Sequence, residues 1–187
     1  MNSTNPFIYS DDNKRYHTLN YYNKSSFNSK VFKAVIDAGF TCPNKDGTKG
    51  TGGCIYCMGG SGYFTEKSDG EIYGSVKRQL AAEKERIYKK HPDSLITAYF
   101  QANTNTYAPV ATLKEAYTAA LDFGVHGISI GTRADCLPDD VIALLCDINS
   151  KTHLTVELGL QTVHDKTAQI INRCYSYDEF LEGYRKL

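Results

Sequence analysis

The 187-residue sequence lacks the features that would direct it to a membrane or out of the cell. No run of apolar residues approaches the roughly 20 that are needed to span a bilayer. Residues 1–12 do not show the basic and then apolar order of a secretory signal. We therefore expect a cytoplasmic protein without a membrane partner, in which the six cysteines favour thiolate chemistry over disulfides.

The sequence also lacks an excess of either charge, with 21 Lys and Arg residues against 21 Asp and Glu residues. Net charge therefore argues neither for nor against a nucleic-acid partner. There is no low-complexity tract, no linker and no internal repeat beyond a strand–helix cycle. The length and the 41% hydrophobic content fit one domain. We expect a mobile N-terminus at residues 1–13 and one core at residues 14–187.

Aromatic side chains are concentrated near the N-terminus, where residues 14–30 mix cations with four rings: Tyr16, Tyr21, Tyr22 and Phe27. Such a mixture could contact a nucleobase by stacking and a phosphate by charge. The alternative is an amphipathic segment whose rings cover the edge of the domain. The sequence alone leaves both interpretations open.

Strand and helix signals alternate along the chain. Short β-branched runs predict strands at residues 31–36, 95–101, 126–130 and 153–160. Helical spacing predicts helices from residue 70 to Pro92, over 112–123 with a stop at Gly124, from Pro138 as the first helical residue, over 165–172 and from 177 onward. This order implies parallel strands and right-handed crossovers. About four strands are too few to close a barrel, so we expect an α/β fold with a partial (β/α) barrel, incomplete at its C-terminal end.

Polar residues follow the predicted strands at the places where ligands bind in parallel sheets. Six of them fall at or near such ends: Cys42, Gln101, Asn103, Arg133, Glu157 and Gln161. Because Glu157 lies between Val156 and Leu158 in its strand, it points to the opposite face from both.

The glycine-rich loop after the first strand carries Cys42, Cys54 and Cys57. A thioredoxin-like pair is disfavoured, because the Cys-x-x-Cys sequence does not open a helix. Zinc would require a fourth ligand, and no second Cys-x-x-Cys is present. An iron–sulfur cluster can be held by three cysteines with one iron open. From spacing alone, a cluster and a zinc site both remain open.

Four stretches together resemble a known family: D-A-G-F-T-C-P-N-K-D-G-T-K-G-T-G-G-C-I-Y-C at 37–57, Y-F-Q-A-N-T-N-T-Y-A-P at 99–109, S-I-G-T-R-A-D-C-L at 129–137 and V-E-L-G-L-Q-T-V-H-D-K-T at 156–167. They are similar to the radical S-adenosylmethionine (SAM) superfamily, and in particular to the YtqA/YhcC-like branch related to the Elongator catalytic subunit. The resemblance implies a radical SAM barrel in which Cys42, Cys54 and Cys57 bind a [4Fe–4S] cluster.

The resemblance also assigns residues to the second cofactor, SAM. Tyr56 would lie beside the adenine. The methionine part would meet Gln101 and Asn103, and the SAM carboxylate would pair with the fork of Arg133. Glu157 and Gln161 would face the ribose hydroxyls.

The substrate implied by the resemblance is a modified nucleobase, either in tRNA at the wobble position or as free queuine in a lyase reaction. Whether the enzyme is a lyase or a transferase stays open, and a cellular electron donor is required. A homo-oligomer is one way to close an incomplete site. One departure from relatives is N-R-C-Y at 172–175, where Arg-Gly-His is expected. The alternatives are a zinc-stabilised nucleic-acid-binding module and an inactive scaffold that keeps the motif.

Overall fold

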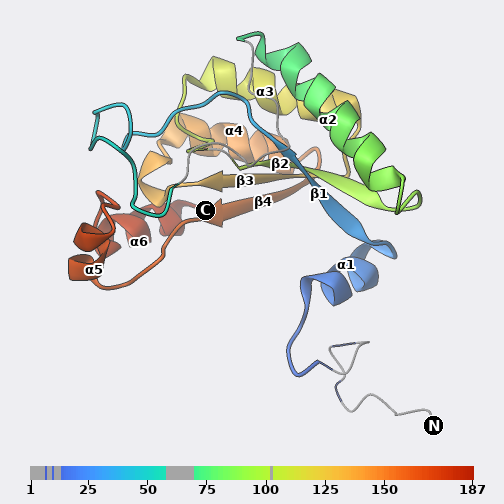
Figure 1. Ribbon diagram of the computed structural model, residues 1–187, viewed down its shortest axis with the longest axis horizontal. Helices are drawn as coiled ribbons and strands as arrows, with labels where there is room; N and C mark the ends of the chain where they lie inside the picture. The colour runs from blue at the N-terminus through green and yellow to red at the C-terminus, as the bar shows by residue number, and fades with distance from the viewer. Residues whose placement is uncertain (1–6, 8–9, 11–13, 58–69, 102) are drawn as a thin grey trace.

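The computed structural model describes residues 7, 10, 14–57, 70–101 and 103–187 (Figure 1). Its centre is a four-stranded sheet in the order β1-β2-β3-β4, and every neighbouring pair is parallel. The strands are β1 (Val31–Ile36), β2 (Leu95–Phe100), β3 (Gly127–Thr132) and β4 (His153–Leu158). The predicted α/β partial barrel is therefore confirmed. The prediction was correct at both ends of β1 and at the first residues of β2 and β4, and the remaining predicted ends differ from these by one or two residues.

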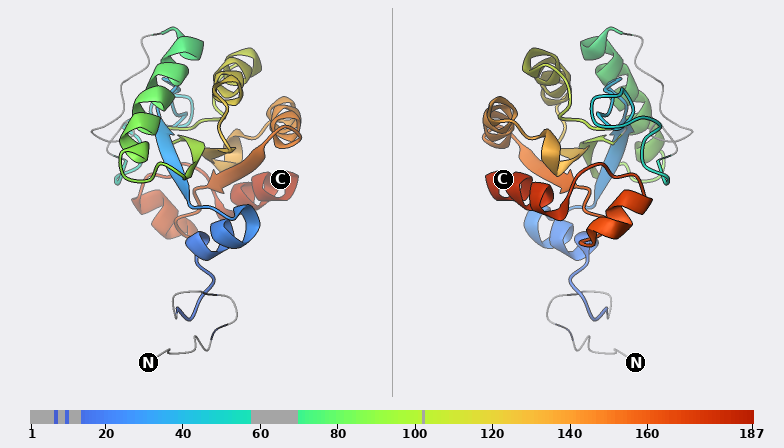
Figure 2. Two further views of the ribbon diagram at one scale, coloured as in Figure 1. Left: turned by 90° about the vertical axis from the view of Figure 1, so that its right-hand side faces the viewer. Right: turned by 90° about the vertical axis from the view of Figure 1, so that its left-hand side faces the viewer.

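Three helices pack in an arc against one face of the sheet: α2 (Ile72–Tyr88), α3 (Val110–Phe123) and α4 (Asp139–Asn149) (Figure 2). Alternate strand residues such as Ile36, Phe100 and Ile130 are fully buried in the core on this side. Gly124 ends α3 in the left-handed conformation, with φ 81°, as predicted. Pro138 was predicted as the first residue of α4 and is its N-cap, so the helix begins one residue later.

The N-terminal aromatics cover one end of the sheet. Helix α1 (Leu19–Phe27) is capped by Thr18 and lies at the amino end of the strands (Figure 1). The ring of Phe27 lies 4.3 Å from that of His126 and 5.2 Å from that of His153, centroid to centroid. These contacts favour the covering role over nucleobase stacking for Phe27. Most of the predicted mobile segment, residues 1–13, lies outside the described residues.

The chain beyond β4 forms two short helices, α5 (Asp165–Ile170) and α6 (Tyr177–Lys186). Helix α6 packs on the 3-10 turn η1 (Ala134–Cys136) that follows β3. A Cβ added to Gly183 would clash with the carbonyl oxygen of Ala134, so this contact requires glycine. Among the described residues, no helix has the length and apolar character that crossing a bilayer requires.

Candidate functional site

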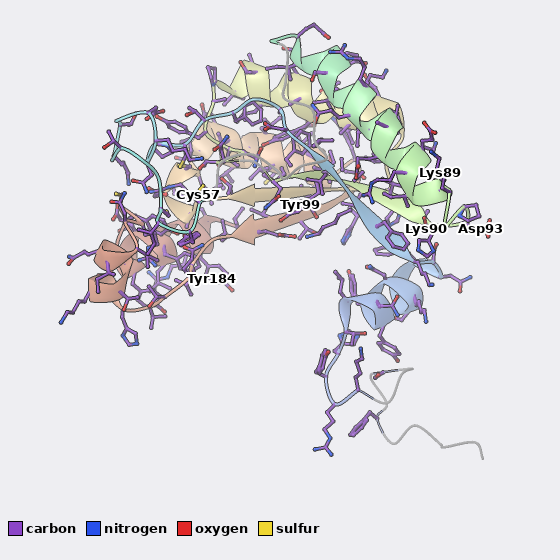
Figure 3. The ribbon with its side chains drawn as sticks, in the orientation of Figure 1. Cys57, Lys89, Lys90, Asp93, Tyr99 and Tyr184 are labelled. Carbon is purple, nitrogen blue, oxygen red and sulfur yellow. The ribbon has the colours of Figure 1, made fainter. Side chains whose placement is uncertain are left out.

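The cysteine loop, defined as residues 42–57, lies at the end of the sheet to which the strand arrows point, opposite α1 (Figure 1). Figure 3 labels Cys57 at this end. All three loop thiols are free; Cys42 is buried, Cys54 half-buried and Cys57 exposed. The first turn is closed by the amides of Lys45 and Asp46, which donate to the carbonyl of Cys42 at 2.8 and 3.1 Å. The loop thus presents thiols at the edge where parallel sheets bind ligands.

A distant segment, residues 171–174, supports the cysteine loop. The Asn172 side chain donates to the carbonyl oxygen of Gly53 at 2.8 Å, and the amide of Ile55 donates to that of Ile171 at 3.1 Å. Asn172 and Cys174 both adopt positive φ, 55° and 60°. Such conformations are costly for residues other than glycine and persist where the surroundings enforce them.

Arg133 is buried in a network that joins β3 to the cysteine loop. Its Nε and Nη2 donate to the two carboxylate oxygens of Asp135 at 2.9 and 2.8 Å, and its Nη1 donates to the Arg173 carbonyl at 3.0 Å. Lys49 of the loop bridges Asp135 and Glu179 at 2.7 and 3.0 Å. The fork predicted to meet SAM is thus occupied by Asp135, and a contact with SAM requires this pair to open.

Electrostatic effects in this network oppose one another. Burial favours neutral Asp135, but the hydrogen bonds from Arg133 and Lys49 outweigh it and hold the pKa of the carboxyl below its usual value. Burial lowers the pKa of Arg133, and the hydrogen bonds to Asp135 more than reverse this. Burial, with the neighbouring Asp135 charge, raises the pKa of Cys136 to about 12. Cys136 is therefore a neutral thiol near neutral pH, unlike a reactive thiolate.

Glu157 lies on the sheet face opposite the helices, as its alternation predicted. Its carboxylate pairs with Lys33 of β1 and accepts a hydrogen bond from the Tyr99 hydroxyl at 2.9 Å. The Lys33 Nζ also lies 4.0 Å from the centre of the Tyr99 ring. A flat sheet would separate β1 from β4 by about 14 Å, three strand spacings. The pair between Lys33 and Glu157 therefore reflects the inward curvature of the partial barrel.

Tyr56 and Gln161 are brought together. With its amide nitrogen facing the carbonyl groups, Gln161 donates to Gly159 at 2.8 Å and lies 3.3 Å from the Tyr56 hydroxyl. Burial, followed by the neighbouring Cys54, raises the pKa of Tyr56. Gln161 has φ 57°, so the turn after β4 directs its side chain to this place.

Of the two predicted site residues after β2, Asn103 supports the cysteine loop and Gln101 is exposed to solvent. Asn103 donates to the Phe40 carbonyl at 2.8 Å and accepts from Lys45 at 2.7 Å, which ties β2 to the cysteine loop. Gln101 is exposed at the strand end. The sequence did not reveal Lys45 or Lys49 as partners, because their contacts depend on how the loop folds back on the sheet.

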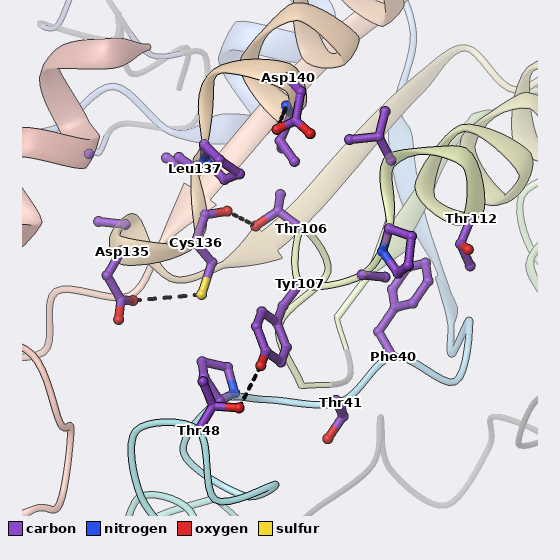
Figure 4. Close-up of a pocket in the computed structure, with 18 of the residues that line it drawn as sticks. Phe40, Thr41, Thr48, Thr106, Tyr107, Thr112, Asp135, Cys136, Leu137 and Asp140 are labelled. Carbon is purple, nitrogen blue, oxygen red and sulfur yellow. Dashed lines mark hydrogen bonds between the residues drawn. The ribbon is translucent and has the colours of Figure 1, made fainter.

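A cavity of about 990 Å³ lies beside the cysteine loop, between the loops after β1, β2 and β3 and helix α6 (Figure 4). Its wall includes Phe40, Tyr107, Leu137 and the acidic Asp135. None of the nine residues predicted to bind the cluster or SAM is among its lining residues. The predicted cofactor residues therefore do not form the wall of this cavity, although Arg133 pairs with Asp135, which does.

The side chains at the cysteine loop could in principle hold either an iron–sulfur cluster or zinc. In the described part of the chain, no three His, Cys, Asp or Glu side chains converge closely enough to hold one metal ion. The three loop thiols are free, however, and an amide nitrogen of Asn44 lies 3.4 Å from the Cys54 sulfur. Amide donors to cysteine sulfur are characteristic of iron–sulfur sites, so the chemistry of the donors fits a three-cysteine cluster once the thiols are gathered.

The chain is thus an α/β protein built on a partial barrel of parallel strands, with a loop that carries three thiols at the carboxyl edge of the sheet. Residues 45–187 match the model of the Radical SAM superfamily, and the chain belongs to this family.

Three curated relatives resemble the chain. The uncharacterized protein YtqA of Bacillus subtilis is 49% identical over 189 residues, which cover 100% of this chain and 58% of the relative. Protein YhcC of Escherichia coli K12 is 39% identical, covering 81% and 47%. The uncharacterized protein MJ0486 of Methanocaldococcus jannaschii is 33% identical, covering 88% and 50%. The chain thus spans about half the length of these relatives.

Proposed function

We propose that this chain provides the cluster-binding and SAM-binding part of a radical SAM enzyme. The observation that carries the proposal is the family match over residues 45–187, which includes Cys54 and Cys57 at the carboxyl edge of a parallel partial barrel. When bound, the cluster and SAM would supply reductive radical chemistry for abstracting a hydrogen atom from the substrate.

The residues of the chain have separate tasks in this proposal. Cys42, Cys54 and Cys57 would hold the cluster. Tyr56 and Gln161, which are already side by side, form the wall for the nucleoside part of SAM. Their ring and amide group would orient the adenine and exclude water from it.

Strand-end residues complete the SAM pocket. Gln101 and Asn103 would face the methionine part, and Arg133 would pair with its carboxylate in place of Asp135. Glu157 would accept from a ribose hydroxyl in place of the Tyr99 hydroxyl. The Glu157 carboxylate would then have a hydrogen-bond donor both with and without SAM.

Anaerobic reconstitution with iron and sulfide tests the cluster. We expect the broad visible absorption of an iron–sulfur cluster in the unaltered chain and its loss in Cys42→Ala. Cys146→Ala is the matched control, because Cys146 is a free, exposed thiol on α4. Stoichiometric zinc without this absorption would instead support the zinc-stabilised module.

Product analysis separates the enzyme from an inactive scaffold. With the cluster loaded, SAM and a reductant should yield 5′-deoxyadenosine. A chain that keeps its cluster and forms no 5′-deoxyadenosine would be the scaffold.

For the substrate, we propose a modified nucleobase, taken either in tRNA or as the free base. One observation supports the free base: Phe27 packs against the sheet end and is therefore not free to stack on a nucleobase of RNA. Filter binding of tRNA at increasing salt distinguishes the two, because phosphate contacts give a steep salt dependence. Tight, salt-dependent tRNA binding would favour the tRNA substrate.

A further inference from the structure

Asn44 is a fully buried side chain within the cysteine loop. Its Nδ2 donates to the backbone carbonyl of Asn172 and lies 3.4 Å from the Cys54 sulfur. A carbonyl oxygen only accepts hydrogen bonds, so the nitrogen of the amide must face it. This fixes the orientation of the amide and directs an N–H group toward Cys54.

The other side of the Asn44 amide is closed by Gly50 and Cys174. A Cβ on Gly50 would clash with Oδ1 of Asn44 and lie 2.9 Å from the Cys174 sulfur. Gly50 is not among the glycines with positive φ, so it is required for space and not for backbone conformation. Within the described residues, Oδ1 has no hydrogen-bond partner. Leaving a buried acceptor unpaired is unfavourable for folding, and a specific task for the amide would explain why it is kept.

The support for the amide comes from residues 171–174. The Asn172 backbone accepts from Asn44, and its side chain donates to the Gly53 carbonyl at 2.8 Å. Asn44 therefore links Cys54 to a segment more than a hundred positions away. The position of the Cys54 sulfur therefore depends on Asn44, which is not itself one of the proposed cluster ligands.

We propose that Asn44 is a positioning residue that holds the Cys54 sulfur and raises the reduction potential of the cluster. This inference rests on the proposed function. A hydrogen bond to a ligand sulfur stabilises the additional negative charge of the reduced cluster, and hydrogen bonds to sulfur are a recognised control of cluster potential. The Asn44 side chain is itself fully buried, so water does not compete for its N–H group.

A redox titration of the loaded chain, followed by electron paramagnetic resonance, tests the proposal. Asn44→Leu keeps the approximate volume and removes the donor, and we expect its midpoint potential to become more negative. Asn105→Leu is the matched control. Asn105 is also fully buried, donates to the carbonyls of Phe100 and Gly131 at 3.1 and 2.9 Å, and leaves its Oδ1 without a partner in the described chain. An unchanged potential in Asn44→Leu, or an equal shift in both variants, would overturn the proposal.

A second measurement uses the chain without iron. Alkylation by iodoacetamide, mapped by mass spectrometry, should change several-fold in rate at Cys54 in Asn44→Leu, because the sulfur loses both its donor and its fixed position, with Cys57 unchanged. Gly50→Ala retains Asn44 and displaces its amide, and we expect the same selective change at Cys54. If the unaltered chain binds no cluster, the proposed function fails, whereas the alkylation pattern still decides whether Asn44 holds Cys54. Equal rates in all three chains would refute the positioning role.

Discussion

Arg173 is a buried cation whose donors are satisfied mainly by the backbone. Only 1% of its surface is exposed, and its guanidinium donates to the carbonyls of Tyr175, Leu160 and Thr162. It also lies 4.4 Å from the centre of the Tyr175 ring. The sequence marked residues 172–175 as unusual, but backbone acceptors leave no signal in a sequence, so this role was not predictable.

We expect Arg173→Lys to lower the free energy of unfolding by about 2 kcal/mol, because an ammonium group cannot reach carbonyls spread around a planar fork. Urea unfolding measures the change. The exposed Arg78→Lys serves as the control and should change the same quantity by less than about 0.5 kcal/mol. Equal effects of the two substitutions would contradict this interpretation of Arg173.

His126 makes the stability depend on pH. Burial, followed by the nearby His153, lowers the pKa of His126 in the folded chain, and the ring of Phe27 packs against it. The unfolded chain therefore binds the proton more tightly. Neutral His126 contributes fully to the stability of the folded chain above the ordinary histidine pKa of about 6.5. This contribution is lost as the pH falls through that pKa toward the lower pKa of His126 in the folded chain.

The urea concentration at the midpoint of unfolding should therefore fall as the pH is lowered from about 7.5 to about 5. His126→Phe should make this fall smaller. His164→Gln, at the exposed start of α5, should leave the slope unchanged. A slope that persists in His126→Phe would assign the pH dependence to other groups.

At the scale of elements, the contact between α6 and η1 depends on one missing side chain. We expect Gly183→Ala to lower the melting temperature, since the new methyl group meets the Ala134 backbone and overpacking costs about 1–3 kcal/mol. Glu182→Ala, at an exposed position on the same helix, is the control. An unchanged melting temperature for Gly183→Ala would show that α6 can shift without loss.

The strands were predictable because each is a short segment with β-branched residues, and β1 was correct at both ends. Their exact ends were not, because β3 extends to Thr132 through its pairing with β4. We could predict from the parallel topology alone that the strand-end residues gather at one edge of the sheet. The Lys33 partner of Glu157 could not be predicted, since a lysine three strands away is equivalent in sequence to many others.

At the scale of the whole molecule, the cysteine loop and residues 171–175 form one unit. We expect cluster loading to slow amide hydrogen exchange in both segments together, because the loop amides of Gly53 and Ile55 and the carbonyl of Ile171 belong to the same support. Exchange in α1 should not change. Protection confined to the loop would show that the two segments move independently.

The position of α1 at the amino end of the strands has a practical consequence. A six-residue parallel strand is about 20 Å long, so this distance separates α1 from the cysteine loop. A solid support attached near α1 would leave the loop facing the solvent. The chain could then be stripped of metal, washed without oxygen, reloaded and exposed to one candidate nucleobase after another on the same surface.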